Sequence, residues 1–499
     1  MTFPAEHGRT GSVNKDETPT SRTHTRAHVG LAAGPLLFAA MLFLPPPEGM
    51  AILAWRTAAV GALMAIWWIT EAIPIAATAL FPIVLFPPLG VATVAATTAP
   101  YANPVIYLFL GGFLIAMALE SCGLHRRMAL AVLGVVGTRP ANLILGFMAA
   151  TAFISMWVSN SATVVMMLPM ATSVIALARG GGDPARDAPS RAFAVALLLG
   201  IAYAGNIGGL GTLIGTPPNA LLAGFMSETY GVQVGFMEWM LLGVPIVVVS
   251  LPVAWLVLTK WLFPVGPEPL AGGAAMLREE RGALGSISRA EWTVGAITAL
   301  TATAWVSRPL IERWFPAVTD AGIAMAGALL LFVVPLEWRP LRVSLTWTHA
   351  ERLPWSVLIL FGGGLSLAAA IEQTGLAGWI GAALSALAGW PVFAVILVVT
   401  TVVIFLTELT SNTATAAAFL PLVASLAIGI GADPMLLAVP TALAASCAFM
   451  MPVATPPNAI VYGTGAITIP QMAKAGMWLN LFFVVLLPLA VYVFAGRIF

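Results

Sequence analysis

Charged side chains are scarce in this sequence. Lysine, arginine, aspartate and glutamate make up 9% of its 499 residues, against about a quarter in an ordinary soluble domain. Hydrophobic residues make up 60%, and the mean hydropathy is +0.95. This small number of charged side chains cannot cover the surface of a soluble protein of this size. Most of the surface must therefore face lipid. The composition excludes a soluble enzyme and predicts a multi-pass membrane protein.

Cysteine, histidine and concentrated positive charge are also in short supply. The two cysteines, Cys122 and Cys447, lie in apolar runs and offer neither a disulfide framework nor a metal cluster. No histidine or lysine lies at the centre of an apolar run, which leaves an intramembrane serine hydrolase without a base. A net charge of +1 argues against nucleic acid as a partner. We therefore expect a protein that is not an enzyme.

Apolar runs long enough to cross a bilayer fill most of the chain. A spanning helix needs about 20 apolar residues, and the runs predict roughly a dozen membrane-embedded elements. We expect the plasma (inner) membrane, with the N-terminus in the cytoplasm. The polar segments divide the chain into four parts: a disordered cytoplasmic tail at 1–28, a first half at 29–263, a polar linker at 264–290 and a second half at 291–499.

The two halves carry the same motifs in the same order. Three pairs of segments correspond, the first two with an offset of 252 residues and the third with an offset of 239: LGGFLIAMALESCGL at 110–124 with GGGLSLAAAIEQTGL at 362–376, SNSAT at 159–163 with SNTAT at 411–415, and TPPNA at 216–220 with TPPNA at 455–459. Repeated polar motifs at matched offsets indicate an internal duplication. Two halves with broken, polar segments at corresponding positions are typical of secondary transporters.

The Ser-Asn-(Ser/Thr) motifs at 159–161 and 411–413 place consecutive polar side chains within apolar runs. Such groups are costly in hydrocarbon unless they are paired. Asparagine and serine favour helix starts, so each motif predicts a re-entrant hairpin that ends there and a new helix just after it. Free N–H groups at a helix start attract anions. The alternative is a buried cap that only stabilises a helix break.

The Thr-Pro-Pro-Asn motifs at 216–219 and 455–458 must interrupt a helix, because two prolines in a row leave nearby carbonyls without donors. In a membrane, freed carbonyls line a cavity or coordinate a cation, and Gly215 and Ala454 could offer them. A simple kink is the alternative. No lysine or arginine lies near the four motifs in the sequence. An anion would then be held by helix starts, hydroxyls, amides and bound cations, and sodium suits such an all-oxygen site.

Three acidic residues lie in or beside these apolar runs. Glu408 precedes the second Ser-Asn-Thr motif, and Met156 stands at the corresponding position of the first half. A carboxylate within a membrane is a candidate functional group, but a capping or packing role is equally open. Glu120 and Glu372 correspond to each other and lie near helix-ending glycines, so we expect them to mark helix ends.

These motifs resemble those of the divalent anion:sodium symporter family, which comprises the INDY-type di- and tricarboxylate transporters and the sodium–sulfate symporters. The resemblance covers residues 50–497. The segments that carry it include FISMWVSNSATVVMMLPM at 153–170, GGLGTLIGTPPNALLAG at 208–224, FLTELTSNTATAAAFLPL at 405–422 and PVATPPNAI at 452–460. The resemblance implies an all-α membrane protein of two inverted repeats, each with a re-entrant hairpin and broken helices. It also implies a scaffold, an elevator-type transport domain and a homodimer in the lipid bilayer.

The function implied by the resemblance is sodium-coupled symport of a divalent anion. We expect a C4 dicarboxylate such as succinate, malate or fumarate, with a sodium:sulfate symporter and a sodium-independent dicarboxylate exchanger as alternatives. The resemblance implies two sodium sites: Ser155, Asn160 and the Gly215 carbonyl in one, and Thr407, Asn412 and the Ala454 carbonyl in the other. It implies substrate contacts at Asn160, Ser161, Asn412, Thr413, Thr216, Pro217, Thr455 and Pro456. Ser161 replaces the usual threonine, which keeps the hydroxyl and leaves slightly more room.

Overall fold

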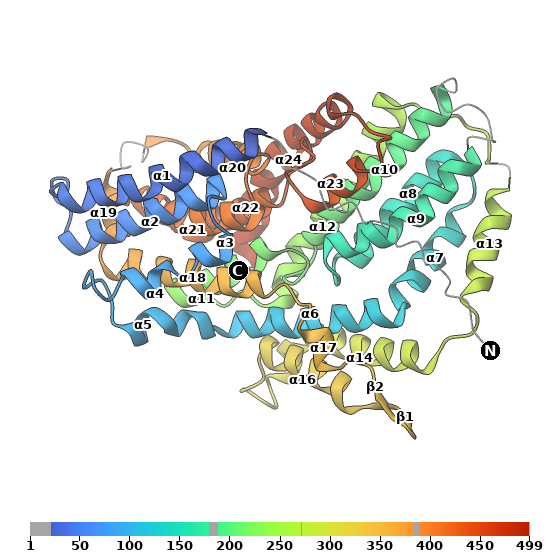
Figure 1. Cartoon of the computed structure of the whole chain (residues 1–499), viewed down its shortest axis with the longest axis horizontal. Coiled ribbons are helices and arrows are strands. Elements are labelled where there is room, and N and C mark those ends of the chain that lie inside the picture. Colours follow the sequence, from blue (N-terminus) through green and yellow to red (C-terminus); the bar gives the residue numbers. More distant parts are fainter. Residues whose placement is uncertain (1–20, 179–187, 271, 384–388, 499) are drawn as a thin grey trace, which may run out of the picture.

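Helices form nearly all of the structure, a computed structural model that describes residues 21–178, 188–270, 272–383 and 389–498. The molecule is elongated, with α1, α2 and α19 near one end and α7 and α13 near the other (Figure 1). The helices of the first half are α1 (Ser21–Phe43), α2 (Ile52–Thr70), α3 (Ile75–Thr78), α4 (Phe81–Leu85), α5 (Val94–Thr98), η1 (Ala99–Ala102), α6 (Pro104–Cys122), α7 (Leu124–Val136), α8 (Pro140–Ser155), α9 (Asn160–Ala178), α10 (Ala188–Gly209), α11 (Pro217–Tyr230), α12 (Phe236–Leu256) and η2 (Val257–Leu262).

The second half repeats this order of elements. Its elements, counted from the linker, are α13 (Gly273–Ala283), α14 (Arg289–Val306), α15 (Arg308–Ile311), α16 (Asp320–Val333), β1 (Pro335–Trp338), β2 (Leu341–Val343), α17 (Trp347–Ala350), α18 (Trp355–Gln373), α19 (Leu376–Ala383), α20 (Val392–Thr407), α21 (Asn412–Gly429), α22 (Pro434–Ala445), α23 (Pro456–Tyr462) and α24 (Ile469–Ile498). The long helices α6 and α18 correspond, as do the hairpins α8–α9 and α20–α21 and the broken helices α10–α11 and α22–α23. The duplication in the sequence is therefore a duplication of structure.

Two glycines end corresponding helices in the same way. Gly123 follows α6 and Gly375 follows α18, and each has φ of +78°. The N–H of Gly123 donates to the carbonyl of Glu120, and that of Gly375 to the carbonyl of Glu372. This left-handed geometry favours glycine and closes the last turn of a helix. Glu120 and Glu372 therefore mark helix ends, as the sequence predicts.

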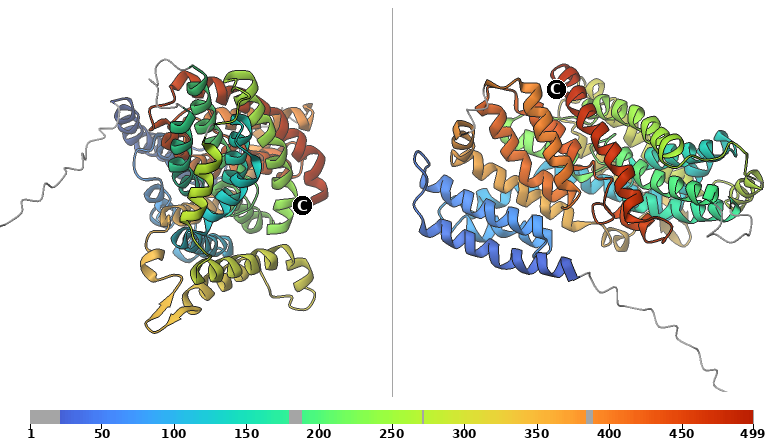
Figure 2. Two further views of the ribbon diagram at one scale, coloured as in Figure 1. Left: turned by 90° about the vertical axis from the view of Figure 1, so that its right-hand side faces the viewer. Right: turned by 90° about the horizontal axis from the view of Figure 1, so that it is seen from above.

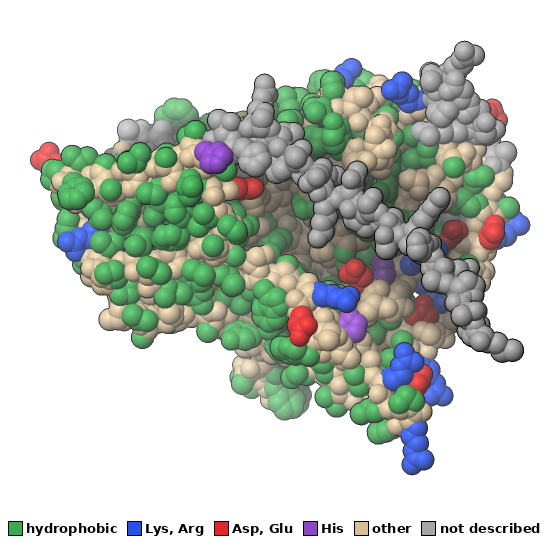
Figure 3. All heavy atoms as spheres, in the orientation of Figure 1, with side chains coloured by type: hydrophobic (Ala, Val, Ile, Leu, Met, Phe, Trp, Pro, Cys, Tyr) green, Lys and Arg blue, Asp and Glu red, His purple; other side chains and the backbone are tan. Residues whose placement is uncertain are grey.

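The described residues contain nine helices that are long and apolar enough to cross a membrane, together with five shorter apolar helices of 10–17 residues. The span at 190–209 is almost wholly buried, whereas few residues of that at 26–43 are buried. α10 can occupy the interior because its small residues let neighbours approach: a Cβ added at Gly208 would overlap the backbone of Ala152 in α8. Hydrophobic side chains cover the face over α1, α2 and α4 (Figure 3). The protein is a multi-pass membrane protein.

Two predicted segment boundaries differ in the structure. α1 begins at Ser21, so residues 21–28 of the predicted tail are helical, and residues 1–20 lie outside the described residues. The linker at 264–290 contains α13 and the first residues of α14. The antiparallel strands β1 and β2 are an exception to the all-α expectation. They have four and three residues, too few to show the alternation that marks a strand in a sequence.

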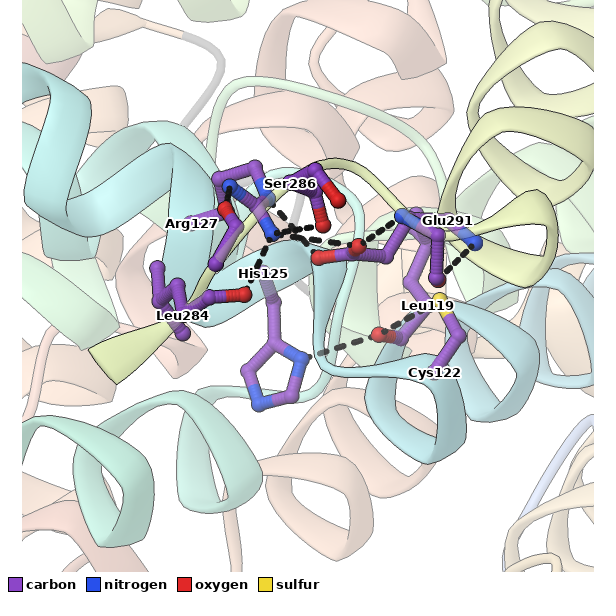
Figure 4. A network of polar contacts seen from close by, with 9 residues as sticks. Leu119, Cys122, His125, Arg127, Leu284, Ser286 and Glu291 are labelled. Carbon is purple, nitrogen blue, oxygen red and sulfur yellow. Dashed lines mark hydrogen bonds and ion pairs between the residues drawn. The ribbon is translucent and has the colours of Figure 1, made fainter. Parts of the chain in front are cut away.

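The end of the linker is fixed to α7 by Arg127 (Figure 4). Its guanidinium forms an ion pair with Glu291 at the start of α14, with Nε 2.8 Å from Oε1. Its other nitrogens donate to the carbonyls of Leu284, Gly285 and Ser286. The layer formed by α14, α16 and the two strands protrudes from the rest of the molecule (Figure 2). Arg127 thus ties this layer to the first half at the point where the two halves are joined.

Candidate functional site

The first Ser-Asn-Ser motif lies at the tip of a helical hairpin. α8 ends at Ser155 and α9 begins at Asn160, so residues 156–159 form the turn between them. Ser159 caps α9 by accepting a hydrogen bond from the N–H of Ala162 at 3.3 Å. The new helix thus starts at the motif, as the sequence predicts. The hairpin consists of both α8 and α9, so the motif forms its tip rather than its end.

The second motif has the same position. α20 ends at Thr407 and α21 begins at Asn412, with Ser411 just before the first helical residue. Ser411 also lines a cleft of about 550 Å³, together with Ser356 and residues 71–76. The second tip therefore borders an open cleft, which the side chain of Glu71 also lines.

Oxygen atoms converge on the amide of Asn160 at the first tip. The Ser155 hydroxyl lies 2.6 Å from this amide and 2.9 Å from the carbonyl oxygen of Gly205. When the amide is oriented to satisfy its neighbours, Nδ2 donates to the carbonyls of Gly205 at 3.3 Å and Gly215 at 3.2 Å. A hydroxyl, an amide and two carbonyls thus meet at one point, and hard cations such as sodium prefer a set of this kind.

The second tip repeats the hydroxyl–amide pair. The Thr407 hydroxyl lies 2.8 Å from Oδ1 of Asn412 and 2.8 Å from the carbonyl oxygen of Ala445. Ala454 is buried in the segment that follows α22, where its N–H donates to the carbonyl of Met451 at 3.2 Å. The second half therefore repeats the hydroxyl (Thr407), the amide (Asn412) and one carbonyl beside them, that of Ala445.

The asparagine of each Thr-Pro-Pro-Asn motif pairs with carbonyls of the broken helix. Residues 210–216 separate α10 from α11, and residues 446–455 separate α22 from α23. Each side chain is buried and its Nδ2 donates to two carbonyls: Asn219 to Gly209 at 3.0 Å and Thr212 at 2.8 Å, and Asn458 to Ala448 at 3.2 Å and Met451 at 3.1 Å. The two asparagines, and the carbonyls that they contact, correspond to each other with the same offset of 239 residues. Asn219 and Asn458 are not among the site residues expected from the sequence, although their repetition in both halves was the available signal.

The two broken helices interlock across the halves. α11 packs against α21 and α22, and α23 packs against α9 and α10. Thr216 and Ser446 are joined directly, with their hydroxyl oxygens 3.3 Å apart. From α10, Nδ2 of Asn206 lies within hydrogen-bond distance of three groups of the second half: the Ala448 carbonyl at 3.3 Å, the Thr455 hydroxyl at 3.1 Å and Oδ1 of Asn458 at 3.5 Å. Each half thus places its broken helix against the hairpin of the other.

The expected site residues differ in exposure. Ser155 and Thr407 are fully buried within their hairpins. The other expected residues fall into three groups: Gly215, Thr216, Thr413, Ala454 and Thr455 are buried, Asn160, Ser161, Asn412 and Pro217 are half-buried, and Pro456 is exposed. The amides and Ser161 are therefore accessible, whereas the hydroxyls behind them are not.

A basic side chain lies near the second tip in space, although none lies near it in the sequence. Arg26, from α1, donates to the carbonyl of Leu409 in the second tip at 2.8 Å. It also donates to the carbonyl of Ile69 at the end of α2. The sequence could not reveal this contact, because 383 residues separate Arg26 from Leu409. A basic group therefore does lie beside the second tip, although two backbone carbonyls engage its guanidinium.

Glu408 is buried beside the second tip and has a full set of donors. Its carboxylate accepts hydrogen bonds from the N–H groups of Phe449, Met450 and Met451 and from the amide of Asn480. Of the two interpretations that the sequence left open, the capping role fits these contacts. Its partners could not be predicted from the sequence, because they lie in the second broken helix and in α24.

Comparison with known proteins agrees with these features. The family model described as the sodium:sulfate symporter transmembrane region matches residues 25–497. The chain is 44% identical over 470 residues to the sodium-dependent dicarboxylate transporter SdcS of Staphylococcus saprophyticus, covering 93% of this chain and 90% of the relative. It is 42% identical over 473 residues to SdcS of Staphylococcus aureus, with the same coverage.

Two solved structures share the fold at low sequence identity. The YdaH transporter of Alcanivorax borkumensis has a TM-score of 0.54 at 15% identity, covering 95% of this chain and 98% of that one. MtrF of Neisseria gonorrhoeae has a TM-score of 0.56 at 13% identity, covering 92% and 97%. The resemblance stated from the motifs is confirmed along almost the whole chain. This chain belongs to the sodium:sulfate symporter family.

Proposed function

We propose that this protein is a sodium-coupled symporter that moves a C4 dicarboxylate such as succinate, malate or fumarate across the membrane. The observation that carries the proposal is the convergence of the Ser155 hydroxyl and the carbonyls of Gly205 and Gly215 on the Asn160 amide. The hydroxyl–amide pair recurs at Thr407 and Asn412. Relatives at 42–44% identity are named sodium-dependent dicarboxylate transporters, which supports the choice of ion and substrate.

Each half would hold one sodium ion. The first ion would be bound by Ser155, Asn160 and the Gly215 carbonyl. The Asn160 amide would turn its Oδ1 toward the cation. The second would be bound by Thr407, Asn412 and the Ala454 carbonyl. Neutral oxygen ligands leave each ion with its full positive charge, which can then attract an anion through an interior of low dielectric.

The dicarboxylate would bind between the two tips. α9 and α21 start at Asn160 and Asn412, so their free N–H groups and partial positive charge favour a carboxylate at each tip. Ser161 and Thr413 would add hydroxyl donors. The other proposed contacts come from the broken helices: Thr216, Pro217, Thr455 and Pro456. Substrate and sodium would raise each other's affinity, because thermodynamic coupling between two sites is reciprocal.

Transport would follow the elevator scheme implied by the family. The two repeats would be inverted, and the interlocked hairpins and broken helices would move as one body against a scaffold. The protein would act as a homodimer, with its N-terminus in the cytoplasm. The support for a single moving body is the reciprocal packing of α11 and α23 against the opposite halves.

The test is uptake of labelled succinate by proteoliposomes that contain the purified protein. An inward sodium gradient is expected to drive accumulation well above the level seen with potassium on both sides, because each dianion would enter with its sodium ions. Liposomes without protein set the background. Equal uptake in the two salts would reject sodium coupling.

The description of the matching family model favours one second candidate, a sodium:sulfate symporter. Competition separates it from the main proposal. A hundredfold excess of unlabelled succinate, but not of sulfate, is expected to block uptake of labelled succinate. Repeating the competition in potassium, with succinate inside the vesicles, detects a sodium-independent exchanger.

A further inference from the structure

A second cleft, of about 330 Å³, lies where the start of α8 meets the end of α12. Its walls come from three segments: Arg139 and Asn142 at the start of α8, Trp255 and Lys260 in α12 and η2, and residues 265–267 in the linker. α8 runs from this cleft to Ser155, so the cleft lies at the end of the hairpin away from the first tip. Its volume is at the lower end of the range for small-molecule sites, which suits a small anion or a headgroup.

The charged side chains that line this cleft are both basic. Arg139 and Lys260 are exposed, and in the part of the chain that the structure describes neither side chain forms a hydrogen bond or an ion pair. Glu268 is the acidic residue nearest to Lys260 in the sequence, and it is exposed and does not line the cleft. The cleft therefore carries two positive charges that have no carboxylate partner among the described residues.

Hydrogen bonds between the segments hold the walls of the cleft in place. Nε1 of Trp255 donates to the carbonyl of Ala141 at 2.8 Å, which ties α12 to the start of α8. The N–H of Leu270 donates to the carbonyl of Thr138 at 3.0 Å, which ties the linker to the residue before Arg139. No side chain caps α8, so its first N–H groups add to the positive potential of the cleft. An anion would thus meet a frame that is already formed, which lowers the entropy cost of binding.

The cleft lies at the edge of the apolar part of the chain. Lys260 is the third residue from the end of the apolar span Phe236–Leu262. The next residue, Trp261, is exposed and packs against the exposed Trp478 of α24, with ring centroids 4.3 Å apart. Tryptophans gather at the level of the lipid headgroups, and a lysine near the end of a span extends to the same level. The cleft is therefore placed where lipid phosphates are concentrated.

We propose that this cleft binds a phosphate anion, supplied by the headgroup of an anionic phospholipid. The guanidinium of Arg139 would donate to two phosphate oxygens, and Lys260 would add a second positive charge. Basic pockets between membrane helices suit anionic headgroups. The level of the cleft in the membrane favours a lipid over free phosphate as the source of the anion. This site is separate from the proposed sodium and substrate sites.

The experiment titrates the purified full-length protein in detergent with dioleoylphosphatidylglycerol and counts the bound lipid by native mass spectrometry. We expect the double substitution Arg139→Gln/Lys260→Gln to raise the Kd of the first bound lipid about thirtyfold, or about 2 kcal/mol, because two basic contacts are lost. Dioleoylphosphatidylcholine has the same acyl chains but no net charge. It is expected to bind the wild type about tenfold more weakly than the anionic lipid.

Two controls separate charge in the cleft from other effects. Asn142→Ala alters the same cleft without removing a charge, and Arg289→Gln/Arg313→Gln removes two charges from exposed residues outside it. Each control is expected to keep the Kd within about twofold of the wild-type value. If the double substitution in the cleft does not fold, Lys260→Gln alone is expected to raise the Kd about fivefold.

An unchanged Kd in the double substitution, or in Lys260→Gln where only that variant folds, would overturn the inference. Equal affinity of the wild type for the two lipids would also overturn it, because the cleft would then not select a negative charge. Inorganic phosphate distinguishes the two sources of the anion. An excess of it, at an ionic strength held constant with chloride, is expected to leave most of the anionic lipid bound. Full displacement of the lipid would show that free phosphate is the ligand and would overturn the lipid assignment.

Discussion

Asn160→Ala and Asn412→Ala are each expected to lower the initial rate of succinate uptake to about one hundredth of the wild-type rate or less, a loss of about 2.7 kcal/mol. Each amide contacts a buried hydroxyl, Ser155 Oγ or Thr407 Oγ1, and each begins the helix that follows its tip. Alanine would remove an oxygen ligand from the proposed cation site and a donor from the substrate site. The measurement is uptake into proteoliposomes under an inward sodium gradient.

Asn142→Ala is the matched control for these two variants. Asn142 is exposed on α8, in the same hairpin as Asn160 but away from its tip. We expect Asn142→Ala to take up succinate at the wild-type initial rate. Expression and elution from a sizing column must match the wild type in all three proteins. A normal rate in either tip variant would remove that asparagine from the site.

The largest expected loss of stability follows from Asn219→Leu and Asn458→Leu. Each substitution removes two hydrogen bonds from an amide to backbone carbonyls. Other donors stay on three of these carbonyls: Gly215 on Thr212, Asn206 on Ala448 and Ala454 on Met451. A hydrogen bond contributes about 0.5–1.5 kcal/mol, so the loss of two should cost each variant about 1–3 kcal/mol of stability. Asn458→Leu should lose more, because Oδ1 of Asn458 also accepts from Asn206. The measurement is the midpoint of thermal unfolding in detergent.

Asn142→Leu provides the control for this series, since it places the same side chain at an exposed position. Its melting temperature should stay close to that of the wild type. A wild-type melting temperature for Asn219→Leu or Asn458→Leu would mean that water or another group replaces the amide. The role assigned to the two repeated asparagines would then be wrong.

The positions of the two tips could be predicted from the sequence because they depend on local chemistry. A Ser-Asn pair within an apolar run is stable only where a helix starts, and both Asn160 and Asn412 are first residues of a helix. Two adjacent prolines must begin a helix rather than continue one, and α11 and α23 begin at Pro217 and Pro456. The repeat strengthened each prediction by supplying a second instance.

The contacts between the halves could not be predicted, because they join residues that no local pattern connects. Asn206 has Ala445 at the corresponding position of the second half, so the repeat gave no reason to select it. Arg26 is remote in sequence from the tip that it contacts. Glu408 was visible as an acid in an apolar run, but its donors belong to segments 41 to 72 residues further on. Tertiary packing determines all three.

The ratio of sodium to succinate taken up tests the central claim most directly. That claim is that two neutral, oxygen-rich sites, one in each half, bind the cations that offset the charge of a dianion. Proteoliposomes given labelled sodium and labelled succinate together, under a fixed membrane potential, report both fluxes at once. We expect at least two sodium ions for each succinate. Succinate uptake with no accompanying sodium flux would contradict it.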